Sequence, residues 1–300
     1  MATLYTHQGS NIRKTWLLMA SFFVLVIAVC YAVSFYLGDP SILYIGVVFA
    51  LVMNVGSYWY SDKLVLSMTG AKPVAKADAP ELYNIVENLA ITAGLPMPKV
   101  YIMDDPAPNA FATGRNPEHA VVAVTSGLLQ ILDRNELEGV VAHEMAHIGN
   151  RDMLVMTVAV VLAGFVAIIA DFFSRALMFG GGDNRDSKAG VLFLVLGIVG
   201  IILAPIAAQL MQMAISRRRE YLADATGALL TRYPEGLASA LEKISSYSHP
   251  MQRTSHATAH LFISDPYGAV GKRSFGQKIG GLFQTHPPAA ERIRLLRSMD

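Results

Sequence analysis

The chain has 300 residues, of which 53% are hydrophobic, and its mean hydropathy is +0.40. This composition is too apolar for an ordinary soluble protein, so we expect a protein embedded in a lipid bilayer. The formal net charge of +1 gives no reason to expect nucleic acid as a partner, and the single cysteine, Cys30, excludes a framework of internal disulfides.

Four apolar stretches are long enough to cross a bilayer, whose hydrocarbon core requires roughly 20 apolar residues in a helix. None carries a charge in its interior, and the first is longer than the apolar core of a secretory signal, so we expect an uncleaved anchor. The four predicted transmembrane helices are Trp16–Leu37, Ser41–Tyr60, Met153 to about Ala170, and Gly190–Ile215. Pro205 is expected to bend the fourth.

Basic residues gather at one side of these spans. Arg13 and Lys14 precede the first span, Lys63 follows the second, and Arg217 to Arg219 follow the fourth. By the positive-inside rule, both termini and both polar segments face the cytoplasm. We therefore predict a multi-pass membrane protein whose polar segments lie on the cytoplasmic side.

The order of apolar and polar segments predicts the domain organisation. Because both polar segments lie on the same side of the membrane, they can build one globular domain. The four parts are a first transmembrane hairpin (1–60), the first part of the globular domain (61–152), a second hairpin (153–215) and the second part of the domain (216–300).

Local patterns predict the elements of the first polar segment. Asp78 with Glu81 has the spacing of a capping box, and the helix that follows should end at Gly94. Lys99–Met103 is expected to form a strand. The residues 109–113 and 119–125 flank the turn sequence GRNPE, which favours a β-hairpin.

The next helix carries the most informative motif of the chain. Asn135, with Glu138 three residues later, predicts its start, and we expect it to run from Glu136 to about Ile148. In the second polar segment, residues 248–285 are predicted to be rich in loops, and Ala289–Met299 to form a final helix.

His143 and His147 lie four residues apart, so a helix places both imidazoles on one face, where they can bind one metal ion. Glu144 lies on an adjacent stripe, where a carboxylate can act as a general base without being a ligand. The alternative is a solvated pair of histidines at a helix end.

Catalytic zinc typically has three protein ligands, so a third residue is needed. Glu220 follows the fourth span directly and is our candidate for the third ligand, although it could instead pair with a neighbouring arginine. Asp224, one helical turn further on, and Asp152 are candidates to accept a hydrogen bond from a ligand imidazole. Asp152 could also simply end its helix.

Other sites are less well supported. His256 and His260 are also four apart, but no carboxylate stands between them. The sequence Glu144-x-x-His147 has the spacing of a di-iron bundle, which usually needs a second such pair that the chain lacks. An intramembrane protease would place the motif within an apolar span, whereas charged residues surround it here.

Four motifs together resemble the HtpX-type integral membrane zinc metalloproteases, relatives of the CAAX-prenyl endoproteases. They are HEMAHIGNRD at 143–152, REYLADATGALL at 219–230, NAFATG at 109–114, and THPP followed by ERI near the C-terminus. The resemblance implies an α-helical membrane protein with four transmembrane helices and an α+β, zincin-like protease domain on the cytoplasmic side. It also implies a location in a bacterial-type inner (cytoplasmic) membrane.

The resemblance also implies a site and a substrate class. It implies one Zn²⁺ per chain held by His143, His147 and Glu220, with Glu144 as base. Asn109, Ala110, Phe111 and Ala112 would form an edge strand that binds an extended peptide, although the same residues could be an ordinary strand of the core. His286 would help to hold the substrate or the oxyanion, unless it is a turn histidine.

The substrates implied are polypeptides, in particular damaged or misfolded membrane proteins, and the role implied is quality control of membrane proteins. The alternative is a membrane scaffold or chaperone-like protein in which zinc is only structural. The presence of Glu144 argues against that alternative, because a structural zinc site has no need of a base.

Overall fold

The computed structural model describes residues 4–159, 161, 162, 164, 217–253, 258–267 and 287–299. The chain divides into two compact units. The first contains Met1–Ile12, Ser61–Thr157 and Ile215–Asp300, and the second contains Arg13–Tyr60 and Val158–Ala214. Each unit is thus assembled from segments that are distant in the sequence.

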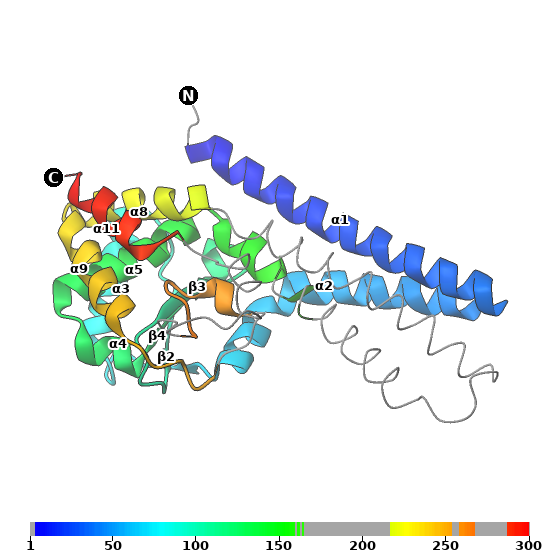
Figure 1. The fold of residues 1–300 in the computed structure, drawn as a ribbon, viewed down its shortest axis with the longest axis horizontal. Coiled ribbons are helices and arrows are strands. Elements are labelled where there is room, and N and C mark those ends of the chain that lie inside the picture. Colours follow the sequence, from blue (N-terminus) through cyan, green and yellow to red (C-terminus); the bar gives the residue numbers. More distant parts are fainter. Residues whose placement is uncertain are drawn as a thin grey trace, which may run out of the picture. The chain divides into compact units, whose positions relative to one another are not determined.

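Two long helices, α1 (Leu4–Leu37) and α2 (Ser41–Thr69), supply most of the described part of the second unit (Figure 1). They contain candidate membrane spans at Gly9–Phe35 and Ser41–Thr69. Large apolar side chains on them are exposed, with Phe35 at 80% and Tyr44 at 70%. Such exposure costs free energy in water and none in lipid.

These two helices contain the first two predicted spans, but α1 begins twelve residues before the predicted start at Trp16, and α2 continues nine residues past the predicted end at Tyr60. The described residues contain two candidate spans, whereas four were predicted for the whole chain. The third prediction lies partly, and the fourth entirely, outside the described residues, as does Pro205. Residues 152–159, where the third begins, are helical.

The first unit contains a small mixed sheet in the order β1-β2-β4-β3. Strand β2 pairs in parallel with β4, and β3 pairs antiparallel with β4 in the register Phe111↔Ala123. The predicted strand and hairpin are therefore confirmed. The four strands are β1 (Lys72–Pro73), β2 (Lys99–Met103), β3 (Ala110–Thr113) and β4 (Val121–Thr125).

The hairpin turn requires glycine at one position. Gly114 has φ +138°, and a Cβ there would lie 2.5 Å from the carbonyl oxygen of His119. A side chain is thus excluded by both backbone conformation and space. The short 3₁₀ helix Pro117–His119 completes the connection, with Asn116 as its N-cap.

Helix α3 (Pro80–Ala93) ends, as predicted, at Gly94, whose left-handed conformation caps the last turn. Its start differs from the prediction, because the N-cap residue is Ala79 and no side chain caps the helix. Pro80 opens the helix and fixes its own φ. The capping spacing of Asp78 and Glu81 is therefore not used.

Helix α5 (Arg134–Gly149) begins two residues before its predicted start. Asp133 is the N-cap: its Oδ1 accepts from the N–H of Glu136 at 3.0 Å, and Glu136 Oε2 accepts from the N–H of Asp133 at 2.8 Å. The prediction of Asn135 with Glu138 was wrong. The same spacing occurs twice, and the structure uses the first; Glu136 of that pair also contacts Lys243 of a distant helix at 2.6 Å.

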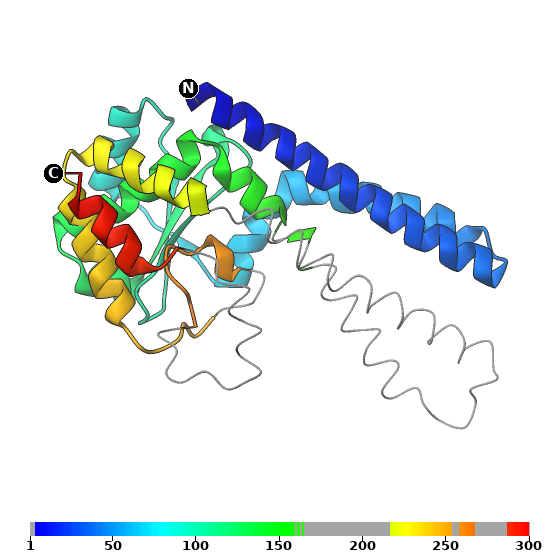
Figure 2. The ribbon, with the colours of Figure 1, turned by 45° about the horizontal axis from the view of Figure 1, so that its top comes forward.

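Helix α5 is the centre of this unit, and all but one of its residues from Glu136 to Ile148 are buried. It packs against β3, β4 and α3, and against α8 and α9. Figure 2 shows the C-terminal helix α11 beside α8 and α9. The remaining helices are α4 (Ser126–Ile131), α8 (Arg217–Thr231), α9 (Pro234–Ser246), the 3₁₀ helix Ala259–Leu261 and α11 (Ala289–Arg297).

The second polar segment follows the predictions where it is described. The final helix starts at Ala289 as predicted and ends two residues earlier, at Arg297. Between residues 248 and 285, the described parts are turns and the 3₁₀ helix. His256 and His286 lie outside the described residues.

Candidate metal centre

Helices α5 and α8 cross closely at the predicted metal site. A Cβ on Gly227 of α8 would lie 3.0 Å from the backbone nitrogen of His143, closer than most real Cβ contacts, so glycine favours this small separation of the helices. Glu220 and Asp224 precede Gly227 at helical spacing and lie on the same buried face of α8. The crossing therefore directs both carboxylates at the histidines of α5.

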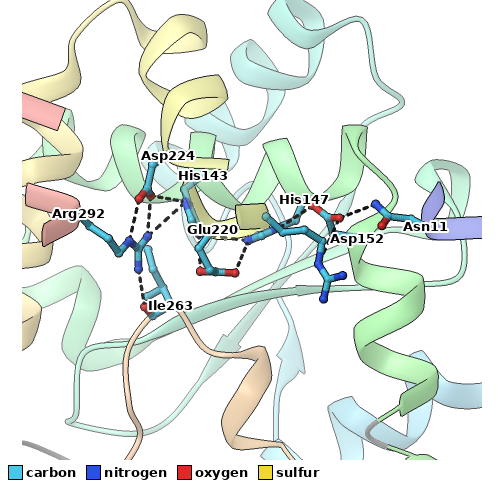
Figure 3. A network of polar contacts seen from close by, with 9 residues as sticks. Asn11, His143, His147, Asp152, Glu220, Asp224, Ile263 and Arg292 are labelled. Carbon is cyan, nitrogen blue, oxygen red and sulfur yellow. Dashed lines mark hydrogen bonds and ion pairs between the residues drawn. The ribbon is translucent and has the colours of Figure 1, made fainter. Parts of the chain in front are cut away.

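The structure brings His143, His147 and Glu220 together (Figure 3). The Nε2 atoms of the two histidines are 3.2 Å apart. The Glu220 carboxylate lies 3.9 Å from Nε2 of His143 and 3.6 Å from Nε2 of His147. All three side chains are buried.

These separations fit a tetrahedral metal ion. Ligand atoms at 2.0–2.1 Å from a zinc ion are about 3.3 Å apart at the tetrahedral angle. Two imidazole nitrogens and one carboxylate oxygen also form the donor set of many catalytic zinc sites, which leave a fourth position open. The residues present therefore fit zinc.

A pair of charged residues orients the His143 ring through Nδ1, the ring nitrogen that does not face Glu220. Asp224 Oδ1 lies 3.0 Å from Nδ1 of His143, and Arg292 of α11 donates two hydrogen bonds to the same carboxylate at 2.7 and 2.9 Å. Arg292 also donates to the carbonyl oxygen of Ile263. Although burial opposes ionisation, the charge of Arg292 and the hydrogen bond from His143 lower the pKa of Asp224 to about 2.

The His147 ring is held on the opposite side of the cluster (Figure 3). Asp152 Oδ2 lies 3.2 Å from Nδ1 of His147, and Asp152 Oδ1 accepts a hydrogen bond from Asn11 at 2.6 Å. Nε of Arg219 is 3.6 Å from Asp152 Oδ1. Each imidazole thus contacts one carboxylate through Nδ1 and turns Nε2 towards Glu220.

The two imidazoles differ in their affinity for protons. Burial lowers the pKa of His143 to about 4, which the hydrogen bond to Asp224 offsets only in part. Burial acts in the same direction on His147, but the hydrogen bond to Asp152 and the charge of Glu220 raise its pKa to about 9. Binding of a cation at Nε2 therefore requires His147 to release a proton.

Glu144 is buried next to this cluster and is not one of the three grouped ligand residues. Burial raises the pKa of Glu144 to about 7, and the charge of Glu220 contributes in the same direction. The backbone N–H of Ala112 in β3 donates a hydrogen bond to Glu144. A carboxylate whose pKa is near neutrality is suited to accept and return a proton.

The residues predicted to bind a peptide line the edge of β3, and all four are buried. The edge is partly paired within the chain: Ala110 accepts from the N–H of Ile263 at 2.9 Å, and Asn109 Nδ2 donates to the Ser264 carbonyl at 3.0 Å. The ring of Phe111 meets that of Phe262 edge to face. The strand thus contacts both Glu144 and the segment 262–264.

Sequence reasoning missed two residues of this site, Arg292 and Asn11. Arg292 stands in the ERI motif, but nothing in its spacing relates it to Asp224, 68 residues earlier. Asn11 precedes the first span predicted from the sequence, Trp16–Leu37, and has no neighbour in the sequence that suggests a role. No local pattern could have identified either residue, because their partners lie in distant segments.

Comparisons with known proteins agree with this geometry. Residues 76–300 match the family model described as peptidase family M48. The chain is 47% identical over 99% of its length to a protease HtpX homolog of Caldanaerobacter subterraneus, of which it covers 98%. It is 52% identical over 97% of its length to a protease HtpX homolog of Syntrophobacter fumaroxidans, of which it covers 100%.

Among solved structures, the chain resembles the crystal structure of S. mikatae Ste24p. The alignment has a TM-score of 0.51 at 17% identity and covers 97% of this chain and 67% of that chain. At this identity the similarity concerns the fold alone.

Proposed function

Since this chain belongs to peptidase family M48 and is a homolog of the HtpX proteases, we propose that it is a membrane-bound zinc endopeptidase that cleaves damaged or misfolded membrane proteins. The observation that carries the proposal is the convergence of His143, His147 and Glu220 beside the buried carboxylate of Glu144. The role that follows is quality control of membrane proteins.

The residues of the site divide the work of peptide hydrolysis. When bound, zinc supplies Lewis acidity and lowers the pKa of a water molecule. Glu144 takes the proton of the attacking water and returns it to the leaving amine. Asp224 and Asp152 hold the ligand rings in the orientation that keeps each Nε2 directed at the metal position.

The segment around β3 is proposed to position the substrate. A peptide lying along this edge would place its scissile carbonyl near Glu144, because the Ala112 N–H already contacts that carboxylate. His286 remains a proposed contact of the substrate or oxyanion, and it lies outside the described residues.

The helices α1 and α2 support the proposed membrane location. Their candidate spans expose large apolar side chains, which favours contact with lipid over water. His143, His147 and Glu220 all lie outside these two spans. This supports cleavage at a site outside the hydrocarbon core, on the cytoplasmic side predicted from the positions of basic residues.

The scaffold alternative with a structural zinc is not favoured. Structural zinc sites usually have four protein ligands, most of them cysteine and histidine. Here three residues are grouped, one of them a glutamate, and the adjacent Glu144 has a pKa raised to about 7. These are features of a catalytic site.

The test is the substitution Glu144→Gln, which keeps the shape of the side chain and removes its ability to take a proton. We expect hydrolysis of unfolded casein by the purified protein to fall by roughly 10²- to 10⁴-fold, with the zinc content unchanged. The matched control is Glu138→Gln on the same helix, which should cleave at the wild-type rate. Wild-type cleavage by Glu144→Gln would show that the base is wrongly assigned.

The substrate class needs a separate experiment. In proteoliposomes, a membrane protein and its destabilised variant are offered together, and their disappearance is followed on gels. We expect the destabilised variant to be cleaved several-fold faster. Equal rates would contradict the proposed role in quality control and leave the peptidase assignment standing.

A further inference from the structure

We propose that Asn11, in the first turns of α1, is a positioning residue of the metal centre that acts on the ligand His147 through Asp152. This inference rests on the zinc site of the proposed function. Asn11, Asp152 and His147 all belong to the first compact unit, and all three are buried. Asn11 lies 141 residues before Asp152 in the sequence, so the surroundings of the metal position include a distant segment of the chain.

The geometry begins with the sharp turn that ends α5. Asn150 caps the helix, Arg151 has φ +57°, and Asp152 starts the next helical segment. A left-handed conformation is unfavourable for a residue with a Cβ, by roughly 1–2 kcal/mol, so neighbouring contacts must hold this turn in place. The turn allows Asp152, five residues after His147, to reach back to its ring.

The amide of Asn11 bridges this turn. Its Nδ2 donates one hydrogen bond to the carbonyl oxygen of Asn150 at 3.0 Å and one to Oδ1 of Asp152 at 2.6 Å (Figure 3). The other oxygen of Asp152 contacts Nδ1 of His147 at 3.2 Å. One amide thus fixes both the backbone before Asp152 and the carboxylate that orients the ligand ring.

Only some side chains can make this bridge. Asparagine offers two N–H donors on one nitrogen, and both are directed at acceptors here. Aspartate has no donor when ionised and would place a second negative charge beside Asp152. Alanine would leave the buried Asp152 carboxylate with its contacts to Arg219 and His147 alone among those described.

The position of Asn11 also links the metal centre to a candidate membrane helix. The residue lies in α1, near the start of the candidate span Gly9–Phe35. The orientation of a zinc ligand therefore depends on a side chain from a predicted membrane anchor. Removal or displacement of the first turns of α1, which include Asn11, should therefore weaken metal binding even though no metal ligand is lost.

The experiment measures zinc affinity by competition with a chelator, using the purified full chain in detergent. Outer residues that orient a metal ligand typically contribute 10- to 100-fold to affinity, so we expect Asn11→Ala to weaken zinc binding about 10-fold. Asn11→Asp should weaken it further through charge repulsion. Asn54→Ala is the control, because Asn54 is also a buried asparagine in a long helix and donates to Ala50; its affinity should equal that of the wild type.

A double-substitution cycle separates the proposed path from a purely structural role. If Asn11 acts through Asp152, adding Asn11→Ala to Asp152→Ala should cause no further loss of affinity. The visible spectrum of the Co²⁺-substituted protein should change in Asn11→Ala as it does in Asp152→Ala. If Asn11→Ala does not fold, Asn11→Ser, which retains one donor, should give an intermediate affinity.

Two results would overturn the inference: wild-type zinc affinity in Asn11→Ala and Asn11→Asp, or losses in the double variant that multiply. Either would leave the zinc site intact. Failure of the wild-type protein to bind zinc would instead overturn the metal centre, and this inference with it.

Discussion

At the scale of single residues, the buried charges around the ligands are arranged in compensating sets. Asp224 would be costly to bury alone, and Arg292 neutralises it with two hydrogen bonds. Because Arg292 also donates to the Ile263 carbonyl, it joins α11, α8 and the segment beside β3. The position of His143 therefore depends on a residue close to the C-terminus.

We predict that Arg292→Met lowers the free energy of unfolding by about 3–5 kcal/mol, because it leaves a buried carboxylate without its cation. Chemical denaturation of the purified protein measures the change. The control is Arg297→Met on the same helix, whose solvent-exposed pairs with Glu235 and Glu242 should contribute far less to stability. Equal losses in the two variants would contradict the importance of burial.

The sequence predicted part of this site. His143, Glu144 and His147 follow from a spacing within one helix, which fixes their relative geometry wherever the helix lies. Glu220 could be proposed only because its segment was expected on the same membrane side as theirs. Arg292 and Asn11 could not be predicted, because only the folded chain places them beside Asp224 and Asp152.

At the scale of elements, α5 approaches its neighbours through glycines. A Cβ on Gly139 would lie 2.6 Å from the backbone nitrogen of Leu237 in α9, closer than any real contact of this kind. Gly227 plays the corresponding part between α8 and α5. Glycine is normally unfavourable inside a helix, so its presence here reflects the need for close packing.

We expect Gly139→Ala to separate α5 from α9 and to lower the free energy of unfolding by about 1–3 kcal/mol, the usual cost of overpacking. Thermal or chemical unfolding measures this loss. Gly149→Ala is the matched control on α5, since a Cβ there would meet only a side-chain carbon of Leu95 at an ordinary 3.6 Å. It should be neutral or slightly stabilising. A stable Gly139→Ala would show that the two helices can separate without cost.

The N-terminal caps of α3 and α5 were predicted less well than the other features of the elements. Two capping patterns stood two residues apart before α5, and the structure uses Asp133 with Glu136. The local spacing is the same for both patterns, and Glu136 of the pattern that is used also pairs with Lys243 in α9, a contact that no local pattern contains. Strands and helix ends at glycine were predicted well, because their signals lie within the element.

At the scale of the whole molecule, the metal position joins segments that the sequence keeps apart. His143 and His147 belong to α5, Glu220 belongs to α8, and predicted membrane segments lie between them. A cation bound at this position therefore connects two parts of the chain that meet only in the folded state, so it stabilises that state.

We predict that removal of the metal by a chelator lowers the midpoint of thermal unfolding. Zinc present at 100 times its dissociation constant stabilises the folded state by about 2.7 kcal/mol, and this contribution is lost on chelation. Differential scanning fluorimetry measures the shift. His147→Ala serves as the control, because its unfolding should no longer respond to chelator. An unchanged midpoint in the wild-type protein would indicate that the ligand set does not hold zinc.

The sequence by itself determined the apolar helices α1 and α2, the hairpin of β3 and β4, and the paired histidines with their adjacent glutamate. Each of these depends on hydrophobic length, turn chemistry or helical spacing, which act between residues close in the chain. Only the tertiary structure decided which carboxylate each imidazole contacts and which cation or amide holds that carboxylate. Those contacts arise where distant segments exclude water together, since a buried charge is stable only beside partners that the fold brings to it.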